Sequence, residues 1–339
     1  MKIAYCYNRS DQANRRWYQA EPELMRRHGH EVLTFSLDQL AGYNHGLGRI
    51  SDGGVWNNHL FNEVCRIARN FNPDIASFLG PVSGVSPSAY WACKDLNIPV
   101  VQHLVSCYLV CPGNRLLNNR KNCQWCCDLT SQVPEGRHQQ GGRYASFMRR
   151  ISKSVHMFLR TWDRKIDRYI ACSEFTKSQF VEEGLAADKL SVRPNFLYET
   201  PSIEIGTKSD FVVYFGELDK SHGVQVLMDA WRLAEKKYKL LVIGSGPLES
   251  TVRRMEVESG GEVEYLGHQP PSVVYRILSD AKLCIAPSLL PDVSSRVLVD
   301  AYSMGTPVVA SDIGGFSENI LVGETGWLVE AGYAFLLAT

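Results

Sequence analysis

The feature that most constrains the fold is a regular alternation of short apolar runs with segments of helical length. In the first half of the chain the apolar runs predict five strands, at Lys2–Tyr7, Glu31–Phe35, Ile75–Leu79, Val100–Leu104 and Arg168–Cys172. Segments long enough for a helix lie between most of them. This alternation is typical of parallel sheets covered by helices on both faces, so the expected fold class is α/β.

A polar stretch divides the chain into two halves. Ser191–Leu197 ends the first half with a strand and a proline turn, and residues 198–210 are expected to form a linker. The strand pattern then starts again, with candidates at Phe211–Phe215, Lys239–Ile243, Val263–Leu266, Leu283–Ala286, Pro307–Ala310 and Trp327–Val329. We therefore expect two Rossmann-like domains, residues 1–197 and 211–339.

Charge and hydropathy exclude several classes of protein. The 339 residues carry 36 basic and 36 acidic side chains, and this balance offers no case for a nucleic-acid partner. The segment Met1–Tyr7 is typical of a first strand and not of a signal peptide, and no apolar run reaches the roughly 18 residues that a membrane span needs. We expect a cytoplasmic protein whose ten cysteines are mostly reduced.

The segment after the apolar run Ala281–Ala286 is the most informative about function. Pro287 ends this expected strand, a loop follows, and Ser294 or Ser295 is suited to cap a helix that runs to about Met304. The first turn of such a helix presents free backbone N–H groups and a partial positive charge to an anion. A diphosphate is an anion of the kind that such a helix end binds.

Two acidic residues flank the start of this helix. Asp292 lies in the loop and Asp300 inside the helix, so that both carboxylates are able to reach one ligand from two sides and accept hydrogen bonds from sugar hydroxyls. The alternative is that Asp292 complements the helix dipole while Asp300 points to water.

The order of these residues resembles the signature of family 4 glycosyltransferases, which are retaining enzymes of the GT-B fold. The matching positions are Pro287-Ser288, Asp292, Asp300-Ala301, Gly305-Thr306-Pro307-Val308, Ser311, Gly314-Gly315 and Glu318. The signature has glutamate where this chain has Asp292 and Asp300, which shortens each side chain by one methylene.

The resemblance implies two Rossmann-like domains that face a central cleft, with the acceptor on the first domain and a nucleotide-diphosphate sugar, of UDP, GDP or ADP type, on the second. It also implies helices that follow the last strand and close the fold. This chain stops ten residues after Val329, so these closing helices are expected to be missing.

The loop after Phe211–Phe215 departs from the family pattern. Where the family has an arginine and a lysine that neutralise the donor diphosphate, this chain has Glu217 and His222. The loss of two fixed cations is expected to weaken phosphate binding. Lys220 and Arg296 are the candidate replacements, and the alternative for Lys220 is an ordinary solvated lysine.

Glycine turns provide further candidate contacts with the nucleotide. Gly216 begins the loop just described, and Gly244 and Gly246 form a turn through which backbone approaches a nucleotide closely. Tyr265 and Gly267 end the next expected strand, at the position where the family holds the base.

A histidine is the candidate sugar contact in the first domain. The family often has a histidine after its fourth strand, at a position that Val105 occupies here. His103 lies two residues earlier and on the same strand face, from which it is placed to serve the sugar site. The alternative is a strand-end histidine satisfied by backbone groups.

Two segments of the first domain predict other interactions. Cys111, Cys123, Cys126 and Cys127 include a C-x2-C pair and resemble the Cys-rich insert of a polysaccharide-cluster subgroup. They either hold a structural zinc, with Cys127, Cys107 or His138 as the fourth ligand, or remain free thiols. Arg143–Lys165 carries seven basic residues against one acidic residue and has the spacing of an amphipathic helix. This helix either contacts the inner face of the cell membrane or packs on its own domain.

Together these features predict a retaining glycosyltransferase that moves a sugar from a nucleotide-diphosphate donor to a hydroxyl acceptor, a glycan or a lipid-linked acceptor, in cell-surface glycan assembly. Asp292 would orient the sugar and Asp300 the ribose. The alternative is a non-catalytic GT-B protein, a pseudoenzyme or a truncated chain, that binds a nucleotide or a partner. Five departures from the family pattern favour this alternative, together with the short C-terminus: Asp292, Asp300, Glu217, His222 and Val105.

Overall fold

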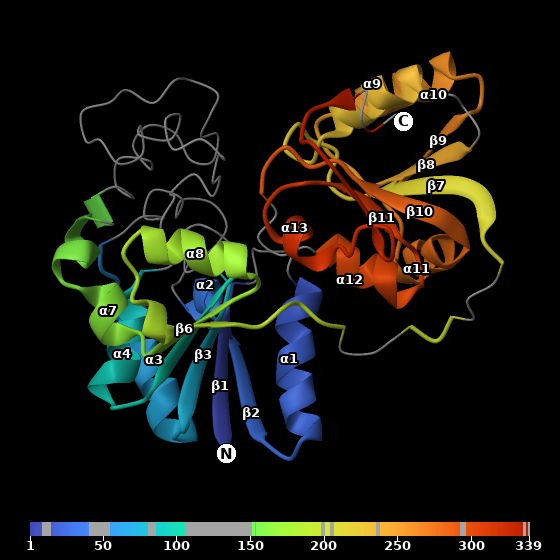
Figure 1. Ribbon diagram of the computed structural model, residues 1–339. Coiled ribbons are helices and arrows are strands. Elements are labelled where there is room, and N and C mark those ends of the chain that lie inside the picture. The colour runs from blue at the N-terminus through green and yellow to red at the C-terminus, as the bar shows by residue number, and fades with distance from the viewer. Residues whose placement is uncertain are drawn as a thin grey trace. The chain divides into compact units, whose positions relative to one another are not determined.

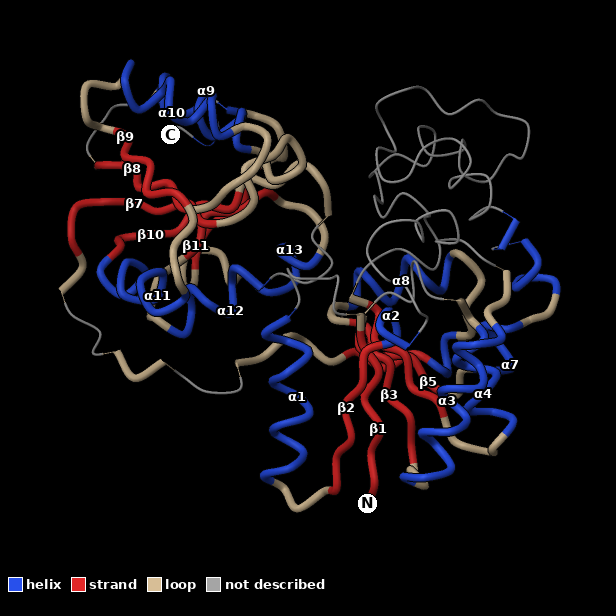
Figure 2. The backbone as a smooth tube through the Cα atoms, turned by 180° about the vertical axis from the view of Figure 1, so that it is seen from behind, coloured by secondary structure: helices blue, strands red, loops and turns tan. Residues whose placement is uncertain are grey.

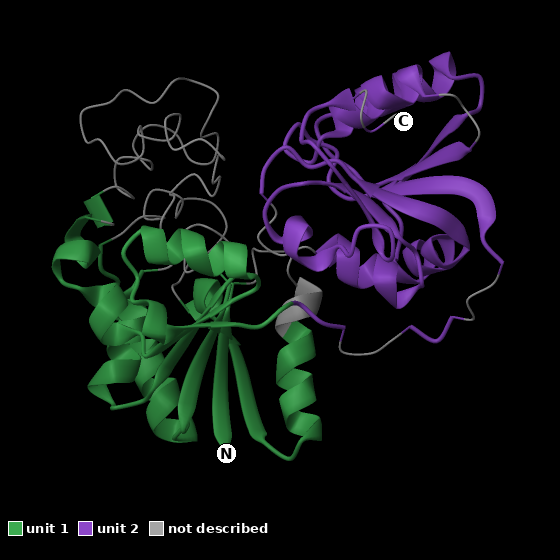
Figure 3. Cartoon of the chain, in the orientation of Figure 1, with its two compact units in different colours: residues 1–194 green, residues 195–339 purple. Residues whose placement is uncertain are grey.

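The computed structural model of this protein describes residues 1–8, 15–40, 55–80, 86–105, 151–152, 154–197, 201–203, 207–234, 238–291, 296–334 and 337. The chain divides into two compact units, unit 1 (Met1–Pro194) and unit 2 (Asn195–Thr339), which Figure 3 shows in different colours. Each unit contains one parallel sheet with helices on both of its faces (Figure 1).

The sheet of unit 1 has six parallel strands in the order β2-β1-β3-β4-β5-β6. These strands are β1 (Lys2–Tyr7), β2 (Glu31–Ser36), β3 (Ile75–Leu79), β4 (Val100–Leu104), β5 (Arg168–Ala171) and β6 (Leu190–Val192). The described helices are α1 (Arg15–Arg27), α2 (Leu37–Leu40), α3 (Asn58–Phe71), α4 (Ser88–Asp95), α7 (Thr161–Lys165), α8 (Glu174–Glu182) and the 3₁₀ helix η5 (Ala187–Lys189). Helix α1 lies on one side of the sheet, and α3, α4 and α7 lie on the other (Figures 1 and 2).

Local sequence determines where these helices begin. The side chain of Asn57 accepts a hydrogen bond from the backbone N–H of Leu60 (2.9 Å) at the start of α3, and Ser173 accepts one from Thr176 (3.0 Å) at the start of α8. The helices pack on a sheet whose central strands β1, β3 and β4 are largely buried, and Phe78 of β3 is fully buried.

The sheet of unit 2 has six parallel strands in the order β12-β11-β10-β7-β8-β9. These strands are β7 (Ser209–Phe215), β8 (Lys239–Ile243), β9 (Val263–Gly267), β10 (Ala281–Ala286), β11 (Val308–Ser311) and β12 (Gly326–Val329). The described helices are α9 (Val224–Leu233), α10 (Glu249–Glu258), α11 (Pro271–Asp280), α12 (Arg296–Ser303) and α13 (Gly315–Asn319). Helices α9 and α10 cover one face, and α11, α12 and α13 cover the other (Figures 1 and 2).

The strand order of unit 2 determines where a ligand is expected. From β7 the chain adds β8 and β9 on one side and then returns to add β10, β11 and β12 on the other. The loops that follow β7 and β10 therefore run in opposite directions from neighbouring strands. In open parallel sheets ligands bind at such a point, outside the carboxyl ends of the strands.

The structure confirms the strands expected from the apolar runs, with shifts of one or two residues at some ends. Strand β7 begins at Ser209, so two residues of the predicted linker 198–210 belong to the sheet. The prediction of one continuous amphipathic helix in Arg143–Lys165 is wrong for the part that the structure describes. Arg160 has a left-handed backbone (φ 51°) there, which ends one helical segment before α7 begins.

No helix in the described part of the chain combines the length and the apolar composition that crossing a membrane requires.

Lys208, the residue before β7, forms hydrogen bonds at the ends of two helices of unit 2. Lys208 Nζ donates to the carbonyl oxygens of Ser279 (2.8 Å), in the last turn of α11, and Met304 (3.1 Å), just after α12. It also donates to the Thr306 hydroxyl (2.9 Å), which in turn donates to the Leu278 carbonyl. A cation at helix C-termini satisfies carbonyls that lack helical partners. This contact accounts structurally for the threonine of the Gly305-Thr306-Pro307 motif.

We expect Lys208→Met to lower the free energy of unfolding of unit 2 by about 1–3 kcal/mol, because buried carbonyls lose a charged donor. Lys239→Met is the control, since Lys239 makes an exposed ion pair with Glu264 (2.6 Å) and such pairs contribute at most about 1 kcal/mol. Urea denaturation with hydrogen exchange resolved by residue measures both. Equal losses in the two variants would contradict the assigned role of Lys208.

Candidate functional site

Backbone groups pack closely at the carboxyl ends of β7, β8 and β9. The N–H of Gly216 donates to Ile243 O (3.0 Å) and that of Gly244 to Gly267 O (2.9 Å). A Cβ at Gly244 would lie 1.8 Å from Gly216 O, so no larger residue fits there. The structure thus brings three of the predicted glycines to one edge of the sheet.

The loops after β7 and β10 meet at the point where the strand order reverses. Ser221 O accepts a hydrogen bond from the N–H of Leu289 (2.8 Å). Gly223 has a left-handed backbone (φ 73°), and a Cβ on it would lie 1.7 Å from Pro287 O. The predicted phosphate loop and the Pro287-Ser288 end of β10 are therefore in direct contact.

We expect Gly223→Ala to destabilise unit 2 more than Gly267→Ala. Both glycines have left-handed backbones (φ 73° and 69°), so alanine costs about 1–2 kcal/mol at either position. At Gly267 nothing lies within 4 Å of the added Cβ, whereas at Gly223 the methyl meets Pro287 O, which adds about 1–3 kcal/mol. Urea denaturation of the two variants measures the difference. Equal destabilisation would mean that the two loops are not in close contact.

Tyr265 in β9 lies at the same edge of the sheet. Its hydroxyl donates to Gly244 O (2.9 Å), and its backbone N–H donates to a Glu256 carboxylate oxygen (2.8 Å). The Arg253 guanidinium carbon lies 4.7 Å from the centre of the tyrosine ring. These contacts hold Tyr265 in a fixed position beside the glycine turn.

The loop between β7 and α9 contains a hydrogen-bonded aspartate and histidine. Asp219 Oδ1 accepts from both the backbone N–H and the ring Nδ1 of His222, each at 2.8 Å, and Oδ2 accepts from Ser221 Oγ (3.1 Å). Burial works against ionisation of Asp219, but the hydrogen bonds from His222 outweigh it and lower its pKa to about 2. Lys220, between them, is exposed.

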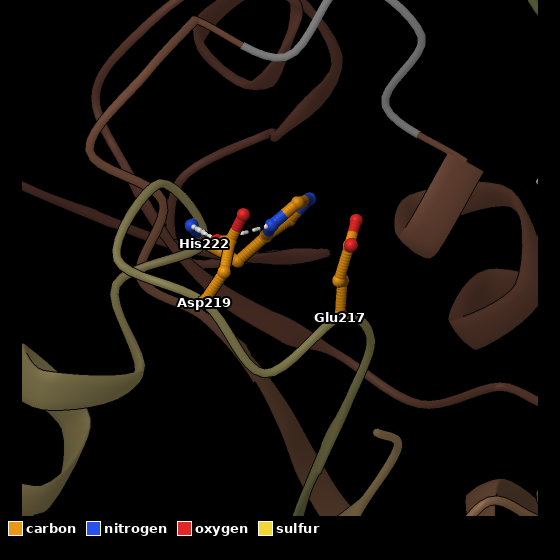
Figure 4. A group of neighbouring side chains, drawn as sticks. All are labelled: Glu217, Asp219 and His222. Atoms are coloured by element: carbon orange, nitrogen blue, oxygen red, sulfur yellow. Dashed lines mark hydrogen bonds and ion pairs between the residues drawn. The ribbon is translucent and has the colours of Figure 1, made fainter. Parts of the chain in front are cut away.

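Glu217 lies near this pair without a drawn contact to it (Figure 4). One atom each of Glu217, Asp219 and His222 lies within 4.8 Å of the others, a spacing that is open to a metal ion as well. Because both oxygens of Asp219 accept hydrogen bonds from protein groups, we interpret the arrangement as an aspartate–histidine pair.

Asp300 lies in α12 and accepts a hydrogen bond from the hydroxyl of Tyr275 in α11 (2.6 Å). The carboxylate is therefore oriented by a neighbouring helix and does not simply point to water. Arg296 is the first residue of α12 and is half-buried. Predicted contacts at Asp292, Ser294 and Ser295 lie outside the described residues.

The predictions for Cys111, Cys123, Cys126 and Cys127 also lie outside the described residues, as does the part of Arg143–Lys165 before residue 151. The described cysteines are buried free thiols, Cys6, Cys65, Cys93, Cys172 and Cys284.

His103 lies in β4 and is only 3% exposed. Its ring Nδ1 is 3.3 Å from the Arg193 guanidinium, and its Nε2 is 3.0 Å from Ser77 Oγ and 3.7 Å from a Glu21 oxygen. Since a guanidinium only donates, Nδ1 accepts and the ring proton lies on Nε2. The partners are side chains and not the backbone groups of the alternative prediction, while the predicted contact with a donor sugar stays a prediction.

The same network contains a buried ion pair. Arg193 donates to Glu21 Oε2 (2.5 Å), and Tyr5 donates to Glu21 Oε1 (3.2 Å). Burial alone would raise the pKa of Glu21, but His103 and Arg193 together hold it below its usual range. Burial lowers the pKa of His103 from 6.5 to about 4, against the attraction of Glu21, so the ring is neutral at neutral pH.

This burial of His103 predicts a pH dependence of stability. Below pH 6.5 His103 becomes protonated in the unfolded chain, whereas in the folded protein it stays neutral down to about pH 4. Protonation therefore favours unfolding, and stability falls by up to about 3 kcal/mol as the pH drops across this range. We expect His103→Gln to show a shallower fall in urea denaturation between pH 7.5 and 4.5. The exposed His28→Gln is the control, and identical slopes in all three proteins would contradict the assignment.

Several of these residues were not predicted from the sequence. Asp219 lies three residues before His222 in a turn, a spacing at which aspartate commonly bonds backbone N–H groups, and this signal could have identified it. Glu21 and Arg193 are 172 residues apart, and no local pattern indicates that they meet.

Solved structures of glycosyltransferases share this fold. A crystal structure of Anabaena Alr3699/HepE in complex with UDP is similar with a TM-score of 0.68, at 17% identity over all of this chain and 88% of that chain. The apo form of the lipopolysaccharide outer core galactosyltransferase WaaB is similar with a TM-score of 0.63, at 16% identity over all of this chain and 89% of that chain. At these identities the likeness establishes the fold alone, and it confirms the predicted GT-B class.

Sequence comparison finds relatives among glycosyltransferases. Residues 209–338 match the family model described as "Glycosyl transferases group 1". The chain is 30% identical to a phosphatidyl-myo-inositol mannosyltransferase of Mycobacterium leprae over 59% of this chain and 56% of that protein. It is 28% identical to a lipopolysaccharide 1,2-N-acetylglucosaminetransferase of Salmonella typhimurium over 47% and 48%. The chain thus spans about half the length of these relatives.

Proposed function

We propose that this chain is a retaining, family 4 glycosyltransferase that moves a sugar from a nucleotide-diphosphate donor to a hydroxyl acceptor. The observation that carries the proposal is the edge of unit 2 where β7 and β10 diverge. Here Gly216 and Gly244 pack directly against each other at the carboxyl ends of β7 and β8. Two further observations support the proposal: the family match covers every strand of this sheet, and the Asp300 carboxylate in α12 accepts a hydrogen bond from Tyr275.

In this proposal unit 2 binds the donor and unit 1 the acceptor. The first turn of α12, with Arg296, supports the departing diphosphate together with Lys220 and His222. Asp300 accepts hydrogen bonds from the ribose, and Asp292 orients the sugar. The acceptor attacks from the side of the leaving group, and its proton passes to a phosphate oxygen, so that no separate general base is needed.

The relatives suggest which substrates to test first. HepE has been solved with UDP and with UDP-glucose, which makes UDP-sugars the first donors to examine. The mannosyltransferase and the lipopolysaccharide transferase act, by their names, on a phosphatidylinositol and on a lipopolysaccharide. We therefore propose a lipid-linked or cell-surface glycan as the acceptor.

Contact with a membrane is part of the proposal. In the described part of Arg143–Lys165, Phe158 is 87% and Met157 55% exposed beside the basic residues Arg160 and Arg164. Apolar side chains next to basic ones suit the interface of an anionic bilayer.

A non-catalytic nucleotide-binding protein is the second candidate. The observation that favours it is that Glu217 and Asp219 place two carboxylates in the loop where the resemblance has cations. Carboxylates repel a diphosphate, so donor binding in the correct geometry is the property to test.

The test combines binding with transfer. UDP, GDP and ADP and their sugars are screened for an increase in the melting temperature, because a ligand that binds only the folded state stabilises it. Absence of any increase would contradict the proposal. An increase without sugar transfer to water or to lipid-linked acceptors would favour the non-catalytic candidate.

We expect Asp300→Asn to weaken binding of the nucleotide that raises the melting temperature by roughly tenfold, because a charge-assisted bond to the ribose becomes a neutral one. Asn keeps an acceptor for Tyr275, so the fold is retained. The control is Asp229→Asn on α9, whose carboxylate pairs with Arg232 (3.0 Å) away from the glycine edge. Isothermal titration measures both, and an unchanged affinity in Asp300→Asn would move the donor site elsewhere.

A further inference from the structure

The Asp219–His222 pair is built so that one side chain fixes the other. Asp219 Oδ1 accepts hydrogen bonds from both the backbone N–H and the ring Nδ1 of His222, each at 2.8 Å. The second oxygen of Asp219 is held by the Ser221 hydroxyl at 3.1 Å. Backbone and ring are thus fixed together, and Nε2 lies at the edge of the ring opposite Asp219 (Figure 4).

The loop that contains this pair is itself held in place. Ser221 bonds to Leu289 of the loop after β10, and Gly223 packs against Pro287. His222 is therefore anchored where β7 and β10 diverge, the position at which an open parallel sheet binds its ligand. A flexible lysine would have no comparable anchor.

The charges around His222 make its protonation state important. The loop carries two carboxylates, Glu217 and Asp219, against one ammonium, Lys220, and the low pKa of Asp219 keeps it ionised throughout the working range. With a neutral imidazole the loop has an excess of one negative charge, which a proton on His222 cancels. The neighbouring segments 244–246 and 287–291 contain no titratable side chain. Arg296, the first residue of α12, adds a positive charge to the proposed site, and Asp292 lies outside the described residues.

We propose that Asp219 is a positioning residue that holds the His222 imidazole so that its protonated form donates from Nε2 to the diphosphate of the donor nucleotide. Donor binding then requires a proton at His222, in place of the permanent charge of a lysine. The inference rests on the proposed function, because it takes the nucleoside diphosphate as the ligand of this edge.

The experiment measures the affinity for UDP by isothermal titration between pH 5.5 and 8.5, in EDTA, for the wild type and four variants. The terminal phosphate of UDP itself titrates near pH 6, so every curve is divided by that of His222→Lys, whose charge is constant over this range. We expect the ratio of wild type to His222→Lys to fall about tenfold with rising pH, as a charge-assisted bond becomes neutral.

Three further variants separate positioning from structure. Asp219→Asn keeps an acceptor for His222 but loses the charge, so the midpoint of the ratio should move to lower pH, which a purely structural role of Asp219 would not cause. His222→Ala should be weak and follow only the titration of UDP. Lys220→Ala should lower the affinity without moving the midpoint of the ratio. Circular dichroism confirms that each variant is folded.

Some outcomes would overturn the proposal alone. One is that UDP binds but the ratio of the wild-type affinity to that of His222→Lys does not depend on pH. Another is that the affinity of Asp219→Asn drops without a shift in the midpoint of its ratio. A third is that Mn²⁺ in place of EDTA raises the affinity of the wild type but not of His222→Ala, which would indicate a metal site. Failure of UDP, GDP and ADP to bind at any pH would overturn this inference and the proposed function together.

Discussion

Close contact between backbone segments at the carboxyl edge of the second sheet is the constraint on which the rest of unit 2 depends. Gly244 lies against the carbonyl of Gly216, and Gly223 lies against the carbonyl of Pro287. Because no side chain separates these segments, the loops after three strands occupy one narrow region. A ligand at this edge would meet the exposed residues Gly216 and Ser245, neither of which has a bulky side chain.

In each unit a half-buried cation pairs with polar groups that the helices and the sheet do not satisfy. In unit 2 the ammonium of Lys208 satisfies carbonyls at the ends of α11 and α12, which brings together the helix that contains Tyr275 and the helix that contains Asp300. In unit 1 the guanidinium of Arg193 neutralises Glu21 inside the layer between α1 and the sheet. Removing one partner of such a pair leaves a buried charge, which costs more than the pair contributes.

The sheets and the glycine edge could be predicted from the sequence, because both depend on local information. Apolar runs such as Lys239–Ile243 have the length of a buried parallel strand, and glycines follow them directly. The partners of His103 could not be predicted, since they come from three other parts of unit 1 and polar residues of this kind are usually exposed. The left-handed Arg160 was missed for a related reason, because the charge and apolar spacing of Arg143–Lys165 continue through the point where the helix ends.

The ion pair between Arg193 and Glu21 has a mechanical consequence. Arg193 is the last residue but one of unit 1, and its guanidinium is bonded to a carboxylate that is 5% exposed on α1. The side chain of Arg193 therefore links the residue directly after the three-residue edge strand β6 to helix α1, while its backbone N–H donates to Ala171 O at the end of β5 (2.8 Å). Detaching this edge strand from its carboxyl end requires that both contacts break.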